Sequence, residues 1–290
     1  MKKIAVWGLV ILGLLAVSCA KQPELKGAKN MKDKNHKGFK TKTEIHYKFV
    51  EESGKYIKVL NYKYILRYDN KGNLIERVRY DADGKLTDKF LFKHNDKGNE
   101  IEQALYGTDD KLATKYLSKY DDKDNQIELA SYDAKGMSID KRLSKYDDKG
   151  NRTEDVHYDN TGNLTDKTIT KYDEHGNKIE LNWYWHNELS SKELYKYDDK
   201  DNLIEEIHYG ANGKLIDKFI FKYNDNGNQI ECNMYGDDGK LMDNIISKYD
   251  DKGNQTEKMC YKIEEKDGQI KEIPISLITY EYEFYPEESK

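Results

Sequence analysis

The chain has 290 residues, a formal net charge of −5, 36% charged residues and a mean hydropathy of −1.00. So much charge is typical of disordered chains, but tyrosines and β-branched residues recur here at regular intervals, which disorder does not require. The three cysteines are too few for a disulfide framework. The three prolines, Pro23, Pro274 and Pro286, all lie outside the repeated part of the chain. This placement suits an uninterrupted ladder of backbone hydrogen bonds.

The first twenty residues predict export. Lys2 and Lys3 precede an apolar run over 4–17, which is shorter than an ordinary membrane span and fits a secretory signal. The sequence AVSC, ending at Cys19, resembles a bacterial lipobox, in which the cysteine becomes the lipidated first residue of the mature protein. We therefore expect a signal peptide over 1–18 and a membrane anchor at Cys19. Simple cleavage with release of the protein is the alternative.

A lysine-rich tether is expected over 19–43, beginning at the lipidated cysteine. Lysines far outnumber Glu24 and Asp33 in this stretch, and almost nothing in it is apolar. It is interpreted either as a solvated linker or as a second, electrostatic anchor on an anionic membrane surface. Loss of the signal removes two lysines, so the mature net charge is −5 − 2 = −7.

Most of the remaining chain is one motif repeated with a period of 26 residues, shortened once to 25. An aromatic residue precedes an Asp/Asn-rich turn in each unit, at Tyr68, His94, Tyr120, Tyr146, Tyr172, Tyr197, Tyr223 and Tyr249. A fixed period of this length indicates a stack of similar small units. Regular repeats are expected over about 68–261, within a repeat domain over 44–285 that is followed by a tail at 286–290.

Each repeat predicts a β-hairpin. Turns such as YDNKGN (68–73) and YDADGK (80–85) place Asp first and Gly fourth, which is typical of a type I turn closed by a left-handed glycine. The segments between turns have ordinary strand length. The expected fold is all-β: an elongated antiparallel meander of about nine stacked hairpins, forming a twisted open sheet or a roll. Divergent hairpins at 44–68 and 260–285 are expected to cap its two ends.

Strand alternation predicts two faces. Pairing directly across the DADGK turn places Tyr80 opposite Leu86 and Val78 opposite Asp88. The first unit then has a covered aromatic face, made of Glu76, Val78, Tyr80, Leu86, Asp88, Phe90, Phe92 and His94. Its other face carries Ile75, Arg77, Arg79, Lys89, Leu91 and Lys93.

The acidic residues on the aromatic face recur in every unit. Glu76 and Asp88 have counterparts along the chain, and the tyrosine hydroxyls are expected to be their hydrogen-bond partners. Paired carboxylates can hydrolyse glycosides, but an active site needs one special environment rather than a recurring one. The histidines are scattered without metal-ligand spacing. We therefore expect no enzyme activity, no cofactor and no metal site.

The motif Tyr-Asp-x-x-Gly-Asn, as in YDNKGNLIERVRYD and YDDKGNRTEDVHYDNTGNL, resembles the YD repeats of the RHS family, and the plan of one hairpin per unit is also similar to MORN-type repeats. The resemblance covers roughly residues 60–262. It implies strand sheets that enclose or present other material, with structural or binding roles and no catalytic residues. The chain has no C-terminal effector domain, so surface display is favoured over the role of a shell or immunity component in a toxin system.

The fifth unit breaks the pattern. It reads WYWHNEL (183–189) and is one residue shorter than its neighbours. The expected register places Trp183 on the lysine-bearing face, near Lys192 and Lys196, with Trp185 and His186 in the shortened turn. Exposed aromatic rings beside cations suit a ligand surface, and a packing kink is the alternative.

The sequence thus predicts a lipoprotein anchored in the cell envelope, at the outer membrane or cell surface, whose repeats bind without catalysis. An envelope or host glycan, or a protein, is the expected partner, and nucleic acid is not. The ligand-binding candidates are Trp183, Trp185, His186, Lys192 and Lys196. A structural envelope spacer without a ligand is the alternative.

Overall fold

The computed structural model describes residues 38–266 and 268–286, and this part of the chain forms eighteen β-strands joined by tight turns. The strands are β1 (Phe39–Glu52), β2 (Lys55–Tyr68), β3 (Leu74–Asp81), β4 (Leu86–His94), β5 (Glu100–Tyr106), β6 (Leu112–Tyr120), β7 (Gln126–Asp133), β8 (Ser138–Tyr146), β9 (Arg152–Asp159), β10 (Leu164–Tyr172), β11 (Lys178–Trp185), β12 (Glu188–Tyr197), β13 (Leu203–Gly210), β14 (Leu215–Tyr223), β15 (Gln229–Gly236), β16 (Leu241–Tyr249), β17 (Gln255–Lys266) and β18 (Gln269–Phe284).

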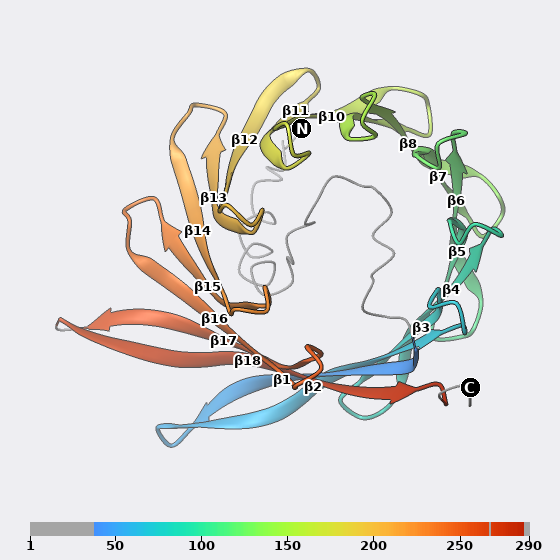
Figure 1. Ribbon diagram of the computed structural model, residues 1–290. Helices are drawn as coiled ribbons and strands as arrows, with labels where there is room; N and C mark the ends of the chain where they lie inside the picture. The colour runs from blue at the N-terminus through green and yellow to red at the C-terminus, as the bar shows by residue number, and fades with distance from the viewer. Residues whose placement is uncertain (1–37, 267, 287–290) are drawn as a thin grey trace, which may run out of the picture.

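The strands form one closed antiparallel barrel (Figure 1). Each strand pairs with the next along the chain, and β1 also pairs with β18, so the sheet returns on itself. The all-β antiparallel meander of nine hairpins is confirmed. Of the two expected arrangements, the elongated, twisted open sheet is wrong, because the sheet closes on itself as a roll does. The first and last hairpins do not cap free edges, because they pair with each other, and closure leaves the sheet without an edge.

The sheet begins earlier than expected. β1 starts at Phe39, so residues 39–43, which were assigned to the tether, belong to the barrel. Phe39 is buried and stacks on Tyr282 of β18. The expected signal peptide, Cys19 and most of the tether lie outside the described residues. In the part of the chain that the structure describes, no helical segment has the length and apolar character that a membrane crossing requires.

The predicted turn chemistry is confirmed. In the first turn the Asp69 carboxylate accepts hydrogen bonds from the backbone amides of Lys71 (2.9 Å) and Asn73 (2.8 Å). Gly72 has a φ of 84° and donates its amide to the Asp69 carbonyl at 3.0 Å. A positive φ strains most side chains, so glycine suits this position. Asp124 and Asp201 occupy it in two other turns, at φ values of 64° and 61°.

The predicted register is wrong beyond the first pair of each hairpin. Tyr80 does lie opposite Leu86, but Arg79 then pairs with Asp88, because Thr87 forms a one-residue bulge. A bulge adds one residue to one strand and reverses which face the following side chains occupy. Similar register shifts accompany the other turns of the regular repeats.

The bulges sort the side chains into two faces. The repeat face is nearly the same in every unit, and in the first unit it carries Glu76, Val78, Tyr80, Lys89, Leu91 and Lys93. The variable face differs between units, and in the first unit it carries Arg77, Arg79, Asp88, Phe90 and Phe92. The predicted aromatic face therefore mixed residues of both, and its recurring Glu and Asp residues lie on opposite faces.

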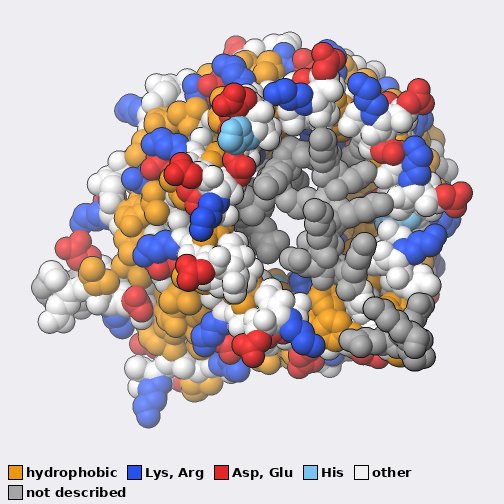
Figure 2. Space-filling view, in the orientation of Figure 1, with side chains coloured by type: hydrophobic (Ala, Val, Ile, Leu, Met, Phe, Trp, Pro, Cys, Tyr) orange, Lys and Arg blue, Asp and Glu red, His pale blue; other side chains and the backbone are white. Residues whose placement is uncertain are grey.

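The variable face lines the inside of the barrel. Side chains converge on the concave side of a closed sheet and spread apart on its convex side. On the repeat face the lysines near the strand ends stay open, as at Lys93, which is 69% exposed, and Lys119, which is 68% exposed. On the variable face charged side chains such as Glu206 and His208 are only 14% exposed. Figure 2 shows lysine and arginine side chains along the outer margin of the ring.

A buried hydrophobic cluster lies mainly on the variable face of β12 to β17. It contains Tyr195, Leu203, Phe221, Cys232, Ile245 and Cys260. Cys232 and Cys260 lie opposite the same residue, Ile245, from its two sides. The two cysteines form no disulfide, as expected for strands separated by an intervening one.

Candidate functional site

The variable face is the part of the barrel where the units differ chemically. The position of Phe90 in the first unit is held in later units by Tyr116, Arg142, Thr168, Glu193, Phe219 and Ile245. The repeat face instead carries a Lys-Glu ion pair between most successive hairpins, with Nζ to Oε distances such as 2.9 Å for Lys93 to Glu102 and 2.7 Å for Lys119 to Glu128. A specific ligand needs distinctive side chains, which the variable face provides.

The tryptophans of the fifth unit lie on the variable face. Trp183 of β11 pairs with Thr168 of β10 and Ser191 of β12, and it is 43% exposed. Trp185 ends β11 and is 54% exposed. Its ring meets the ring of His186 edge-on at 5.1 Å. Both tryptophans thus keep accessible ring surface.

The expected grouping of Trp183 with two lysines is wrong. Lys192 pairs with Asn182 on the repeat face, and its Nζ lies 3.2 Å from Oε2 of Glu180. Lys196 is also on the repeat face, 2.7 Å from Glu205. The bulge of β12 next to the shortened turn reverses the faces, so the lysines and the tryptophan project to opposite sides of the sheet.

A group of cations and aromatic rings lies on the variable face of β2, β3 and β4. The Arg77 guanidinium carbon is 4.3 Å from the ring centroid of Phe90, and that of Arg79 is 4.4 Å from the ring centroid of Tyr62. Tyr64 lies within 6 Å of both. We call these five residues the arginine patch. Stacking on aromatic rings favours arginine over lysine at such positions.

The arginine patch has unused hydrogen-bonding capacity. The Nε atoms of Arg77 and Arg79 are buried, and among the described residues they have no hydrogen-bond partner. The arginine ion pairs in the described chain are those of Arg67 with Glu76 and of Arg152 with Asp155. Two guanidinium groups that lack a carboxylate partner form a positively charged spot beside flat apolar rings.

A second group, on β12 to β14, is acidic. The Nε2 of His208 lies 2.7 Å from Oε1 of Glu206, and its Nδ1 lies 2.7 Å from Oδ1 of Asp217. The Tyr195 hydroxyl donates to Glu193, two residues earlier in β12. We call Glu193, Glu206, His208 and Asp217 the acidic cluster. Burial alone would lower the pKa of His208, but Asp217 and Glu206 raise it to about 9.

The spacing of histidines along the chain does not reveal the acidic cluster, because its residues come from three strands, β12, β13 and β14. Glu193 stands where neighbouring units have Thr168 and Phe219, and this departure is visible once the bulges fix the register. Glu193, Glu206 and His208 bring one ligand atom each to within 4.8 Å of one another. Carboxylate and imidazole groups at this separation are able to hold a metal ion.

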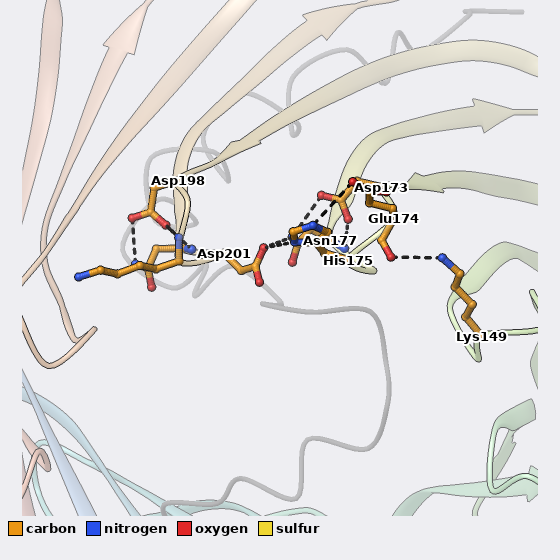
Figure 3. Close-up of polar contacts among 9 residues, drawn as sticks. Lys149, Asp173, Glu174, His175, Asn177, Asp198 and Asp201 are labelled. Atoms are coloured by element: carbon orange, nitrogen blue, oxygen red, sulfur yellow. Dashed lines mark hydrogen bonds and ion pairs between the residues drawn. The ribbon is translucent and has the colours of Figure 1, made fainter.

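At one end of the barrel, polar contacts join successive turns (Figure 3). Lys149, in the turn after β8, donates to the carbonyl of Glu174 in the turn after β10 at 3.2 Å. His175 and Asn177 contact the carboxylate of Asp201, in the turn after β12, at 3.0 and 2.7 Å. These contacts extend from turn to turn and indicate a structural role for this rim.

No protein-family model matches the chain, and no curated protein matches it either. Among solved structures it is similar to a porin-like protein from Bacteroides uniformis ATCC 8492, at 8% identity and a TM-score of 0.48, over 84% of this chain and 98% of that one. A DUF1329 family protein from Desulfovibrio piger ATCC 29098 matches at 7% identity and a TM-score of 0.19, over 87% and 88%. TcdB2-TccC3 without its hypervariable C-terminal region matches at 14% and 0.19, over 84% of this chain and 16% of that chain. Likeness at these identities and scores is no guide to function.

Proposed function

We propose that the protein is a lipid-anchored, non-catalytic binding protein of the bacterial cell envelope, and that the variable face of its barrel holds an acidic glycan. The observation that carries the proposal is the arginine patch, where two guanidinium groups without carboxylate partners lie against aromatic rings. No residue of the patch needs to react with the ligand for it to bind.

The chemistry of the patch favours a sugar that carries carboxylate groups. A guanidinium group forms paired, charge-assisted hydrogen bonds with a carboxylate. Aromatic rings offer a flat apolar surface for the C–H face of a sugar ring. The exposed rings of Trp183 and Trp185 lie on the same face, so we retain both as ligand contacts. Lys192 and Lys196 lie on the repeat face, so the proposal does not include them as ligand contacts.

Both faces of the sheet support a barrel that lies in water. The repeat face carries a Lys-Glu ion pair at most hairpin junctions, and the variable face carries charged groups such as Arg77 and Glu206. A charge facing the hydrocarbon of a bilayer costs several kcal/mol. We therefore place membrane attachment at the acylated Cys19, outside the described residues, and leave the barrel free to meet its ligand.

Binding is tested with the mature protein, lacking only its signal peptide, and uronic-acid oligosaccharides in a calorimeter. Arg77→Gln with Arg79→Gln is expected to weaken binding by about tenfold or more, because hydrogen bonds to charged groups contribute about 1.5–3 kcal/mol. Arg67→Gln is the matched control, since Arg67 lies on the repeat face and pairs with Glu76. Equal losses in both variants, or no binding by the unaltered protein, contradict the proposal.

The anchor has a separate test. In cells, Cys19→Ala is expected to abolish acylation and to move the protein from the membrane fraction to the soluble fraction. A variant that still fractionates with membranes would show that Cys19 is not the anchor. This test is independent of the ligand, because a released barrel keeps the arginine patch.

A structural envelope spacer is the second candidate. It is favoured by the repeat face, whose Lys-Glu pairs recur around the outside of the barrel without distinctive chemistry. If the protein is a spacer, replacing Trp183 and Trp185 together by alanine should lower the free energy of unfolding, and neither the variant nor the unaltered protein should bind a glycan. A binding protein predicts weaker ligand binding with the β-rich fold intact.

A further inference from the structure

The acidic cluster holds more negative charge than its own residues neutralise. Three carboxylates, those of Glu193, Glu206 and Asp217, surround the single imidazole of His208. These groups are largely covered, with side-chain exposures of 13–14% for Glu206, His208 and Asp217. Unbalanced charge away from water is costly, and a cation bound among these groups would remove that cost.

We propose that Glu193, Glu206 and His208 bind a divalent transition-metal ion, Zn²⁺ by the chemistry of its ligands. One ligand atom from each residue lies within 4.8 Å of the others. Zinc bonds to nitrogen and oxygen of about 2.1 Å place neighbouring ligand atoms of a tetrahedral site about 3.4 Å apart. Small side-chain rotations bring the three atoms to that spacing, and the fourth position is left to water or to a ligand.

Asp217 supplies an independent indication of the site. It is only 9% exposed, and its Oδ1 makes no hydrogen bond within the described residues although it lies 2.7 Å from His208 Nδ1. A metal-bound histidine usually donates its other ring nitrogen to a carboxylate, which fixes the ring and its tautomer. With the metal at Nε2, the Nδ1–H of His208 would point to Asp217 in this way.

The fourth repeat shows the same framework without the site. His157 and Asp166 occupy the positions of His208 and Asp217, with Nδ1 3.2 Å from Oδ1. Arg142 lies opposite His157, where Glu193 lies opposite His208. Asp155, at the position of Glu206, is paired with Arg152 at 3.0 Å. Only the acidic cluster thus combines the His-Asp pair with two carboxylates that no arginine neutralises, among the units that the structure describes.

The test is titration of the metal-free mature protein with Zn²⁺ by calorimetry, and with Co²⁺ by visible absorption. We expect one zinc per chain, a cobalt spectrum typical of tetrahedral nitrogen and oxygen ligation, and an increase in the melting temperature with zinc. Glu206→Gln combined with His208→Gln should abolish this binding, whereas His157→Gln should leave it unchanged.

The conservative variant Asp217→Asn should weaken zinc binding by about 10- to 100-fold, as loss of such outer-sphere carboxylates typically does. Far-ultraviolet circular dichroism checks that each variant is folded, and the cobalt spectrum of the unaltered protein does not depend on any variant. Absence of zinc binding, a spectrum typical of six oxygen ligands, or equal losses in His208→Gln and His157→Gln would overturn the proposal. These outcomes leave glycan binding at the arginine patch untouched.

Discussion

At the residue scale, a tyrosine holds the hairpin to its predecessor in most of the repeats. The hydroxyl of Tyr172, at the end of β10, donates to the backbone carbonyl of Arg152 at 2.7 Å. The same bond recurs with a chain separation of 19 or 20 residues from Tyr120, Tyr146, Tyr197, Tyr223 and Tyr249. These residues were expected to be hydrogen-bond donors to recurring glutamates, but their acceptors are backbone carbonyls. We call this series the tyrosine ladder.

Removing the hydroxyl of one tyrosine of the ladder should destabilise the fold by a small, measurable amount. Tyr172→Phe keeps the ring and deletes the hydroxyl, so the Arg152 carbonyl loses its donor, and we expect a loss of about 1 kcal/mol in the free energy of unfolding. Tyr158→Phe is the control, because Tyr158 lies on the repeat face and its hydroxyl makes no hydrogen bond within the described residues. Urea unfolding measures both variants, and equal effects would contradict a specific role for the ladder.

A second residue-scale prediction compares neighbours on opposite faces of β14. Phe221 is 6% exposed within the buried cluster, so Phe221→Ala should cost about 3–5 kcal/mol. Lys222 is exposed and pairs with Glu231 at 2.9 Å, and its replacement by alanine should cost less than about 1 kcal/mol. Chemical denaturation of the two variants distinguishes the faces, and similar losses would mean that strand parity is misassigned.

At the scale of the element, the sequence predicted the hairpins and missed the bulges. Asp and Gly at fixed places in each turn have distinctive chemistry, so the turns and strand ends could be located. The bulged residues Ile75 and Thr87 are ordinary strand residues, and nothing in their type marks them as unpaired. Because one extra residue reverses the faces, the error moved Trp183 beside Lys192 and separated Glu206 from its true neighbours. The acidic cluster could not be predicted without that register.

One hairpin junction offers a stabilising substitution. His94 occupies the tyrosine position at the end of β4, and burial lowers the pKa of its imidazole, which favours the neutral ring. By the spacing of the ladder, a tyrosine there would reach the carbonyl of Leu74. His94→Tyr should therefore raise the free energy of unfolding by about 1 kcal/mol. His94→Phe supplies the ring without the hydroxyl and should not match this gain in a thermal melt.

At the scale of the whole molecule, closure could not be predicted from the repeat. Each turn and each pair of neighbouring strands has the same chemistry in an open sheet and in a closed barrel. Whether the sheet stays open or closes depends on contacts between its first and last strands. There β1 pairs with β18, and the Tyr285 hydroxyl donates to the Tyr68 carbonyl at 2.7 Å. We call the pairing of β1 with β18 the seam. Glu44 of β1 lies at the seam, beside Lys42 (2.9 Å) and His46 (3.6 Å). Burial would raise the pKa of Glu44, but these neighbours lower it to about 2.

The seam should make the barrel sensitive to acid. The folded-state pKa of Glu44 lies below its ordinary value of about 4.3, so its stabilising effect is present above that value. The effect is lost as the pH falls from about 4.5 toward 2. Glu44→Gln should lower stability at neutral pH and flatten this part of the pH profile, measured by urea unfolding at several pH values. Glu281→Gln, at an exposed position of β18, is the control and should leave the profile unchanged.

The tyrosine ladder joins hairpins around much of the closed barrel, which should make the barrel unfold cooperatively in alkali. Burial raises the pKa of Tyr172 and Tyr223 to about 12 and also raises that of Tyr120, Tyr146, Tyr197 and Tyr249. Because these folded-state values lie above the unfolded value of about 10, the ladder's stabilising effect is complete below pH 10. It is lost as the pH rises through about 12. We expect phenolate absorbance and loss of β-sheet circular dichroism to change together over this range. Replacing Tyr172 and Tyr223 by phenylalanine should make the transition less steep, because two fewer protons are then released on unfolding. Gradual ionisation near pH 10 with the sheet intact would show that the hydroxyls are not held as the ladder requires.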